Sequence, residues 1–231
     1  MKKIISYSLW GQDTRYTIGA IQNSKLAKYY FPGWISRFYC SLDVPAEIVQ
    51  EIRNIENTDI VLLDEPANWT GMFWRFYAAA DSDIMISRDS DARLSSREAC
   101  AVQNWLLSND DFHIIRDHPY HGRPIMGGMW GCRNGILSNI QDLIHGFNKL
   151  NRYEIDQDFL GNIVYPIIRD RSVVHDPFYE NKPFPKECGK RIPCFHIGQA
   201  YDQYGVVLGI DEYGPASYLE YIRANEGISI V

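Results

Sequence analysis

The sequence predicts an α/β fold in which a mostly parallel sheet is flanked by helices. In the first part of the chain, short apolar stretches alternate with segments of helical spacing, and this order favours right-handed crossovers between parallel strands. With 231 residues and 45% apolar content, the chain can bury the core of one α/β domain. No repeat, low-complexity tract or obvious linker interrupts it, so we expect a single domain over residues 1–231 with an irregular C-terminal part.

Strands and helices are expected to alternate up to residue 93, and each follows from local spacing. Runs of apolar or alternating residues predict the strands, and apolar residues three and four apart predict the helices. Pro32-Gly33 ends the first helix, because a proline cannot continue helical hydrogen bonding. The expected strands are 3–8, 35–40, 59–63 and 84–87, and the expected helices are 17–30, 45–54 and 69–80.

The second part of the chain is less regular. The elements expected there are helices at 95–107, 137–148, 156–165 and 218–224 and a short strand at 113–116. Pro166 is expected to stop the third of these helices. The segment 124–133 is rich in glycine and tryptophan and is expected to line a cleft. After His175 the chain is rich in proline, glycine and aromatic residues, which favours loops.

Charge and cysteine content limit the possible functions and locations. A net charge of −6 argues against a general nucleic-acid binder. No apolar run is long enough to span a bilayer, and the N-terminal stretch is too short and polar for a signal peptide, so a soluble, cytoplasmic protein is expected. The five cysteines form no C-x-x-C pair, which favours reduced and mostly buried thiols. A Cys188–Cys194 pair in an oxidising compartment remains an alternative.

The most informative motif is Asp89-Ser90-Asp91, directly after the strand expected at 84–87. Two carboxylates one residue apart at a strand end can converge on a divalent cation, whose open positions then take phosphate oxygens. Ligands of parallel sheets lie beyond the carboxyl ends of the strands, so the loop 8–11 should face the same crevice. A plain Asp-rich turn is the alternative. The identical Asp81-Ser82-Asp83 precedes the strand and is interpreted as a turn and cap.

Further candidate residues each have a structural alternative. Arg75 lies on a helix with apolar neighbours, so it either pairs with a carboxylate or reaches a phosphate or ribose. Asp156-Gln157-Asp158 opens a helix, where aspartate caps the helix or, alternatively, lies beside the reacting carbon. Gly127 and Gly128 allow close backbone approach to a ligand, or form a tight turn.

Aromatic and imidazole side chains complete the set of candidates. Trp130 either stacks on a sugar ring or fills the core. His175 follows an apolar pair and is either a core histidine or a third ligand of the cation, with His196 as its competitor. His118 and His121 are interpreted as structural.

Taken together, these residues resemble a GT-A-type glycosyltransferase, and their order is similar to that of the retaining family 8 galactosyl- and glucosyltransferases. The resemblance spans about the first 185 residues. It is carried by an arginine-bearing helix at 73–76, Asp89-Ser90-Asp91, Gly127-Gly128, the segment 156–160 and His175 ahead of Lys182-Pro183.

Some features depart from the family 8 pattern. Gly161 replaces an expected asparagine, the spacing from His175 to Lys182 is one residue longer, and the small-residue strand lacks Asn-Ser-Gly. The stretches 16–23 and 30–34 also resemble small soluble glycosyltransferases of large DNA viruses and bacterial surface-glycan clusters.

The resemblance implies a GT-A-like, Rossmann-type fold and the transfer of a sugar from a nucleotide-sugar donor, UDP-linked in the first instance, to a glycan or other hydroxyl acceptor. Residues 1–93 would form the nucleotide-binding half and residues 94–231 the acceptor-side half. The cofactor implied is Mn²⁺ or Mg²⁺. The implied metal ligands are Asp89, Asp91 and His175. The residues implied to hold the donor nucleotide are Ser8, Trp10, Arg15, Arg75 and Ser90.

The remaining implied roles concern sugar, acceptor and chemistry. Gly127, Gly128 and Trp130 would surround the substrate. Asp156 or Asp158 would be the general base of an inverting enzyme, whereas Gln157 or Asp156 would lie near the anomeric carbon of a retaining one.

Two other functions remain as alternatives. A nucleotidyltransferase also needs paired carboxylates, although no P-loop sequence is present. A non-catalytic nucleotide-sugar-binding module on the same fold is the second. No nucleic acid or membrane-spanning segment is expected to take part.

Overall fold

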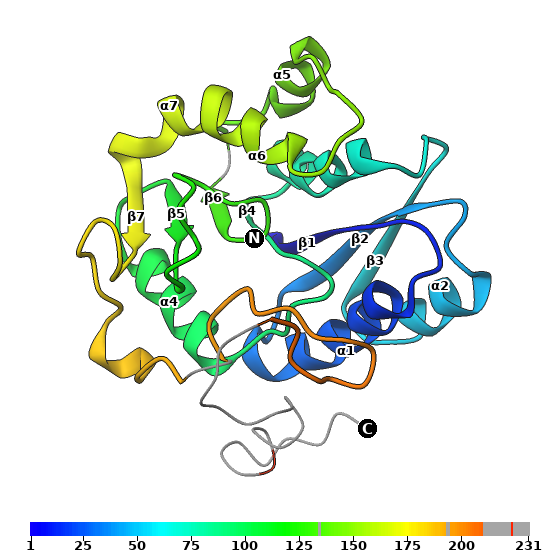
Figure 1. Ribbon diagram of the computed structural model, residues 1–231, viewed down its shortest axis with the longest axis horizontal. Helices are drawn as coiled ribbons and strands as arrows, with labels where there is room; N and C mark the ends of the chain where they lie inside the picture. Colours follow the sequence, from blue (N-terminus) through cyan, green and yellow to red (C-terminus); the bar gives the residue numbers. More distant parts are fainter. Residues whose placement is uncertain (134, 193–194, 210–222, 224–231) are drawn as a thin grey trace.

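The computed structural model describes residues 1–133, 135–192, 195–209 and 223 (Figure 1). In that part of the chain, a sheet with strand order β3-β2-β1-β4-β6-β5-β7 forms the centre of the molecule. Its strands are β1 (Lys3–Leu9), β2 (Ile35–Ser41), β3 (Thr58–Leu63), β4 (Ile84–Ser87), β5 (Phe112–Ile115), β6 (Trp130–Arg133) and β7 (Ser172–His175). Only β6 runs antiparallel to its two neighbours, so the predicted mostly parallel α/β sheet is confirmed.

Helices pack on both faces of the sheet (Figure 1). The α-helices are α1 (Thr14–Tyr30), α2 (Ala46–Arg53), α3 (Ala78–Asp81), α4 (Ser96–Leu107), α5 (Ile140–Gly146), α6 (Ile155–Phe159) and α7 (Tyr165–Ile168). The 3₁₀ segments are η1 (Trp69–Tyr77), η3 (Arg169–Arg171) and η4 (Lys186–Cys188), and η2 (Leu160–Val164) is a π-helix. None of the described helices is long and apolar enough to cross a membrane.

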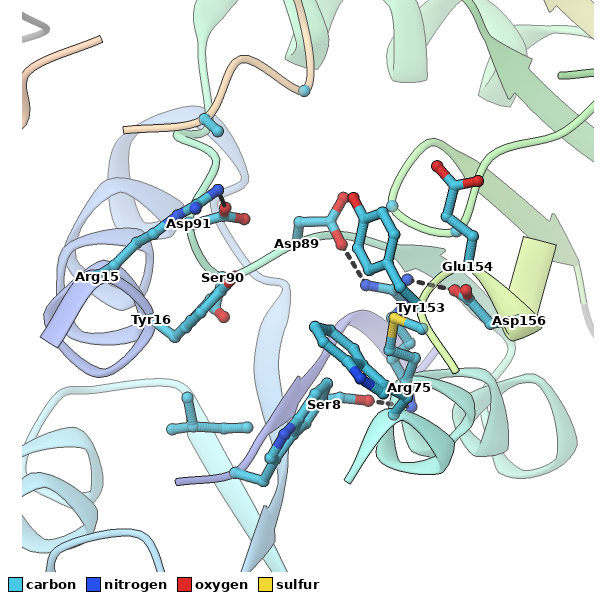
Figure 2. Close-up of a pocket in the computed structure, with 18 of the residues that line it drawn as sticks. Ser8, Arg15, Tyr16, Arg75, Asp89, Ser90, Asp91, Tyr153, Glu154 and Asp156 are labelled. Carbon is cyan, nitrogen blue, oxygen red and sulfur yellow. Dashed lines mark hydrogen bonds and ion pairs between the residues drawn. The ribbon is translucent and has the colours of Figure 1, made fainter. Parts of the chain in front are cut away.

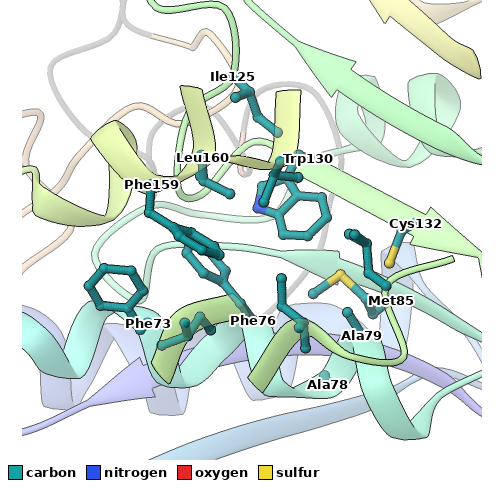
Figure 3. Packing of buried hydrophobic residues seen from close by; sticks show 14 of the residues in the cluster. Phe73, Phe76, Ala78, Ala79, Met85, Ile125, Trp130, Cys132, Phe159 and Leu160 are labelled. Atoms are coloured by element: carbon teal, nitrogen blue, oxygen red, sulfur yellow. The ribbon is translucent and has the colours of Figure 1, made fainter. Parts of the chain in front are cut away.

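Alternation along β1 divides the core between the two faces of the sheet. Ile5, Tyr7 and Leu9 point to one face and pack with residues of α1, α2 and α4. Ile4 points to the other face, which is covered by η1, α5, α6 and α7. On that second face, aromatic residues of η1 and α6 pack against Trp130 and Met85 of the sheet (Figure 3).

Several predicted elements differ from the structure in the second part. Pro166 does not stop the predicted helix 156–165: α6 continues through the π-helix η2 into α7, and Pro166 lies in the first turn of α7. The segment 124–133 ends in strand β6, and the predicted helix 69–80 is a 3₁₀ segment followed by the single turn of α3. The predicted helix 218–224 lies, apart from position 223, outside the described residues.

The cysteine prediction needs correction. Cys100 on α4 and Cys188 on η4 form a disulfide between positions 88 residues apart, with Cα atoms 5.2 Å apart. Cys40 and Cys132 are free and buried, as expected, and Cys194 lies outside the described residues. The packing of η4 against α4, which local spacing does not reveal, brings the two bonded cysteines together.

Candidate functional site

A cavity of about 440 Å³ opens beyond the carboxyl ends of β1 and β4. Both strands are parallel, so the loops that follow them meet at one edge of the sheet. Most of the residues singled out in the sequence line this cavity. They are Ser8, Trp10, Arg15, Arg75, Asp89, Ser90, Asp91, Gly127, Gly128, Asp156 and Gln157.

Helix α1 holds the loop that carries Asp89 and Asp91. The side-chain amide of Asn23 donates to the carbonyl oxygens of Ser90 (3.1 Å) and Ala92 (2.8 Å), and its oxygen accepts from the Leu94 N–H (3.1 Å). Gly19 lets the helix approach closely, because a Cβ there would overlap the carbonyl oxygen of Ser90. These contacts explain why glycine and asparagine stand at positions 19 and 23.

Both carboxylates of the motif are paired with arginines (Figure 2). Arg15 of α1 binds Asp91, and Arg75 of η1 binds Asp89. Arg75 also donates to Asp156 at 2.7 Å and so links the motif to α6. Burial raises the pKa of Asp91 above its ordinary value, and the neighbouring Asp89 carboxylate adds to this rise. Two like charges at one edge of a cavity are typical of a site that takes a cation.

The backbone of Arg75 is fixed by two serines of β1. Ser6 Oγ donates to the Arg75 carbonyl oxygen at 2.6 Å, and the Arg75 N–H donates to Ser8 Oγ at 2.9 Å. Because residues 6 and 8 share one face of the strand, both reach the same turn of η1. Among the described atoms, Arg75 Nε is buried without a hydrogen-bond partner, which leaves a donor at the cavity.

Gly127 and Gly128 pack directly against these charged groups. A Cβ at Gly127 would overlap the guanidinium of Arg75 and the carboxylate of Asp156, and a Cβ at Gly128 would overlap the carboxylate of Asp89. The Ser87 hydroxyl anchors the segment by donating to the Gly127 carbonyl at 2.7 Å. The glycines therefore make room for the network of Arg75 with its two carboxylates.

The segment Asp156-Gln157-Asp158 splits between the cavity and the surface. Asp156 is buried, and burial raises its pKa although Arg75 opposes the rise. Gln157 lines the cavity, and its Oε1 is buried and accepts no hydrogen bond from the described residues. Asp158 turns away and pairs with Arg123 (3.1 Å) and Arg152. The structure therefore does not bring Asp158 to the site where a general base was expected.

The structure contradicts the prediction that His175 joins Asp89 and Asp91. His175 is the last residue of β7, and its side chain is buried. Its Nδ1 lies 2.8 Å from Nε2 of His113, and its Nε2 lies 3.1 Å from Oδ1 of Asn104. Burial lowers its pKa to about 4, and Arg97 adds to this effect. His175 is thus a core histidine with both ring nitrogens in use.

Trp130 is also misplaced by the sequence prediction. It lies on β6, is fully buried and packs edge-on against Phe76 at 5.6 Å between ring centroids (Figure 3). Its ring fills the core on the face of the sheet that η1, α5, α6 and α7 cover, and it does not line the cavity. The glycine-rich approach to this strand belongs to the site, whereas the tryptophan does not.

Several residues that line the cavity were not predicted as site residues, and His121 is one of them. Its Nδ1 accepts the Asp117 N–H at 3.1 Å, so in the neutral ring the proton stays on Nε2. Burial lowers the pKa of His121 to about 4, and His118 adds to this effect. At neutral pH His121 is therefore an uncharged donor. His196, the competing histidine, lies 5.3 Å from it between ring centroids.

Tyr153 and Glu154 are two further cavity residues that the sequence analysis did not single out. They precede α6 and line the cavity beside Asp156 (Figure 2). Burial raises the pKa of Tyr153, and the carboxylates of Glu154 and Asp89 add to the rise. Glu154 has a left-handed backbone with φ of 60°, an uncommon conformation for a residue other than glycine. No periodic pattern marks such loop residues in a sequence.

The donor set fits a hard divalent cation held by two protein side chains. Among the described residues, no group of three or more His, Cys, Asp or Glu side chains is arranged to hold a metal ion. Asp89 and Asp91 supply carboxylate oxygens at the cavity. Mg²⁺ is commonly bound by one or two carboxylates together with substrate phosphates, so two carboxylates are sufficient for such a site.

No protein-family model matches the sequence, and no curated protein matches it. Among solved structures, the chain is similar to S. aureus TarS, with 16% identity over 76% of this chain and 58% of that chain and a TM-score of 0.52. The chain has a GT-A-type fold. It thus spans a little over half of the TarS structure.

Two other solved structures are similar at lower TM-scores. Mycobacterium tuberculosis glucosyl-3-phosphoglycerate synthase, crystallised with Mn²⁺, UDP-glucose and phosphoglyceric acid, is 13% identical over 75% of this chain and 69% of that chain, with a TM-score of 0.47. An active-site mutant of LgtC is 10% identical over 76% of this chain and 73% of that chain, with a TM-score of 0.48.

Proposed function

We propose that this protein is a metal-dependent glycosyltransferase that moves a sugar from a nucleotide-sugar donor, UDP-linked in the first instance, to a hydroxyl acceptor. One observation carries the proposal. Asp89 and Asp91 line the cavity at the end of β4, and Arg75 joins Asp89 to Asp156 across it. The same cavity is therefore lined by a pair of carboxylates, by arginine side chains and by polar side chains from the second half of the chain.

The carboxylate pair is the proposed site for Mn²⁺ or Mg²⁺, with Asp89 and Asp91 as its ligands. When bound, the cation supplies charge stabilisation for the diphosphate as it leaves. Arg15 and Arg75 provide guanidinium groups that bind phosphate oxygens. His121, whose proton is on Nε2, is an uncharged hydrogen-bond donor for the same phosphate oxygens. Ser8 and Trp10 of the β1 loop and Ser90 complete the nucleotide side.

The reaction forms one bond and breaks one. The acceptor hydroxyl oxygen bonds to the anomeric carbon, and the bond from that carbon to the diphosphate oxygen breaks with its electron pair on the phosphate. The hydroxyl proton passes to a carboxylate or phosphate oxygen. Gln157 offers an unpaired amide oxygen beside this centre, and Asp156 keeps Arg75 oriented.

The residues that line the cavity come from both parts of the chain. We therefore retain the division into a nucleotide-binding half, residues 1–93, and an acceptor-side half, residues 94–231. Gly127 and Gly128 lie where the two halves meet in space. Gly128 packs against Asp89 of the first half, and Gly127 packs against Asp156 of the second half.

Calorimetric titration of UDP and GDP tests the proposal, with Mn²⁺ and with a chelator. We expect micromolar binding that needs the cation and weakens at least about a hundredfold in Asp91→Asn, because a lost carboxylate ligand is not replaced. Asp83→Asn is the matched control, since it changes the same motif at the other end of β4 and should bind as the wild type does. Equal binding by Asp91→Asn and wild type would refute the site.

Product analysis then separates the functions. Transfer or hydrolytic release of the sugar from a UDP-sugar would support a glycosyltransferase. Release of pyrophosphate with nucleotide incorporation would indicate a nucleotidyltransferase instead. Tight nucleotide-sugar binding without turnover on any acceptor would indicate a binding module.

A further inference from the structure

Two aromatic rings from separate elements form one wall of the cavity. Trp69 begins η1 and Tyr153 precedes α6, and both line the cavity. Their ring centroids are 5.2 Å apart, with near-perpendicular planes, and Trp69 also meets the ring of Trp10, on the nucleotide side, at 6.5 Å. We call Trp69 and Tyr153 the aromatic wall.

The wall offers apolar surface to a ligand. Trp69 is 41% exposed and Tyr153 is 63% exposed, whereas large aromatic side chains are commonly buried in a core. Figure 2 places Tyr153, Glu154 and Asp156 across the cavity from Arg15 and Asp91. Tyr153 therefore lies on the side away from the Arg15–Asp91 pair.

Two contacts hold the wall in place. The Trp69 N–H donates to Asn151 Oδ1 at 3.2 Å, which ties η1 to the loop before α6. The carboxylate of Glu154 accepts from Arg123 at 2.8 Å and fixes a residue with a left-handed backbone next to Tyr153. Such constrained residues persist where the surroundings hold them and cluster at ligand sites.

The polar groups beside the wall are hydrogen-bond acceptors. Glu154, Asp156 and Gln157 line the cavity there, and Gln157 Oε1 has no donor among the described residues. Of the nearby cationic side chains, Arg123 is paired with Glu154, and Arg75, which is proposed to bind the donor phosphate, is also paired with Asp156. Acceptors next to apolar rings suit a neutral ring that carries hydroxyl donors, and they disfavour an anion.

We propose that the aromatic wall is the acceptor subsite and stacks on the apolar face of a pyranose ring in a neutral saccharide. The adjoining carboxylate and amide oxygens accept hydrogen bonds from its hydroxyl groups. This inference rests on the proposed function and names the chemical class of its acceptor. The donor nucleobase, which also stacks on aromatic rings, is the competing occupant, and the Trp69 variants below distinguish the two.

Saturation-transfer NMR tests the subsite directly. Wild-type protein with diamagnetic Mg²⁺ and the nucleotide that binds best is mixed with maltose, cellobiose or lactose, and separately with 3-phosphoglycerate as an anionic probe. We expect transfer to the ring protons of at least one disaccharide and none to 3-phosphoglycerate. Absence of transfer to all three disaccharides, or preference for the anion, would overturn the proposal.

Variants assign the signal to the wall. Trp69→Ala should weaken disaccharide binding at least about tenfold and leave nucleotide affinity within about twofold, as stacking on an aromatic ring is lost. Trp69→Phe keeps a flat ring and should bind within about threefold of wild type, which also controls for folding. Tyr29→Ala, at a 48% exposed position on α1 outside the cavity, should change neither affinity.

Three outcomes separate the subsite from the function. If Trp69→Ala weakens nucleotide binding more than about tenfold, the wall holds the base and the acceptor assignment is wrong. If nucleotides bind in an Asp91-dependent way but no disaccharide binds, only the acceptor subsite fails. If no nucleotide binds at all, the proposed function itself fails.

Discussion

The same tripeptide, Asp-Ser-Asp, stands at both ends of β4 with opposite electrostatics. Asp81 accepts from Arg37 at 2.8 Å and Lys2 at 2.9 Å and is half exposed. Although partial burial opposes the effect, the hydrogen bonds from Arg37 and Lys2 lower the pKa of Asp81. Asp91 is buried at the cavity, and its pKa is raised. The difference teaches that the end of the strand decides the role, because ligands meet a parallel sheet at its carboxyl edge.

A third acidic triplet, Asp156-Gln157-Asp158, divides between these two behaviours. Asp156 has a side chain 2% exposed and faces the buried Arg75, whereas Asp158 is 27% exposed and pairs with surface arginines. The three triplets therefore form a series from surface to cavity, and substitution within the series tests the comparison.

The largest effect is expected for Asp156→Ala. It leaves a donor of the buried Arg75 guanidinium without its acceptor and should lower the free energy of unfolding by about 3 kcal/mol. Asp158→Ala, which acts on exposed pairs, should cost less than about 1 kcal/mol. Urea unfolding followed by circular dichroism compares them, and equal losses would break the distinction between cavity and surface.

His175 tests the comparison from the other side. A histidine beside two carboxylates would have a raised pKa, whereas burial in the sheet lowers the pKa of His175 to about 4. Its contribution to stability is therefore full above pH ~6.5 and is lost as the pH falls towards 4, about 2 kcal/mol by pH 5. Wild type should lose more stability than His175→Gln between pH 7 and 5. A smaller loss of stability in wild type than in His175→Gln would instead support a raised pKa of His175 and a place beside the two carboxylates.

Gly19→Ala should distort the loop that follows β4. Its Cβ would overlap the Ser90 carbonyl oxygen, and overpacking of this kind costs about 1–3 kcal/mol. Nucleotide affinity should fall at least about tenfold, because the loop carries both carboxylates. Gly146→Ala, where nothing lies near the added Cβ, is the matched helical control and should be neutral or stabilising. An unchanged affinity in Gly19→Ala would contradict the role of α1.

The smallest effects should have opposite signs at the two ends of β4. The raised pKa of Asp91 means that its ionised form costs stability above pH ~4, whereas the lowered pKa of Asp81 means that its ionised form adds stability that is lost on acidification. At pH 7 and without ligand, Asp91→Asn should stabilise by about 1 kcal/mol, and Asp81→Asn should destabilise by about 0.5 kcal/mol. Thermal and urea unfolding at pH 7 and pH 3 measure both, and the differences should shrink at pH 3. Changes of the same sign would refute the contrast.

The two halves of the chain also differ in how far the sequence predicts them. Before residue 93 the strands and helices follow from apolar spacing, and β1, α1, β2, α2, β3 and β4 agree with the predictions within a few residues. Beyond that point β6 reverses direction and α6 continues through a π-helix into α7. Periodicity does not reveal strand direction, which depends on contacts distant in the sequence, or a π-helical turn, which differs from an α-helix by a single residue in its hydrogen-bond spacing.

The sequence by itself determined the parallel α/β order, the carboxylate pair at the end of β4 and the glycine segment beside it, because local patterning and strand polarity place these residues. Only the tertiary structure decided that His175 and Trp130 lie in the core and that His121 and Tyr153 line the cavity. A ring's neighbours depend on which face of which strand or loop carries it. Buried packing, more than residue type, therefore assigns these side chains their roles.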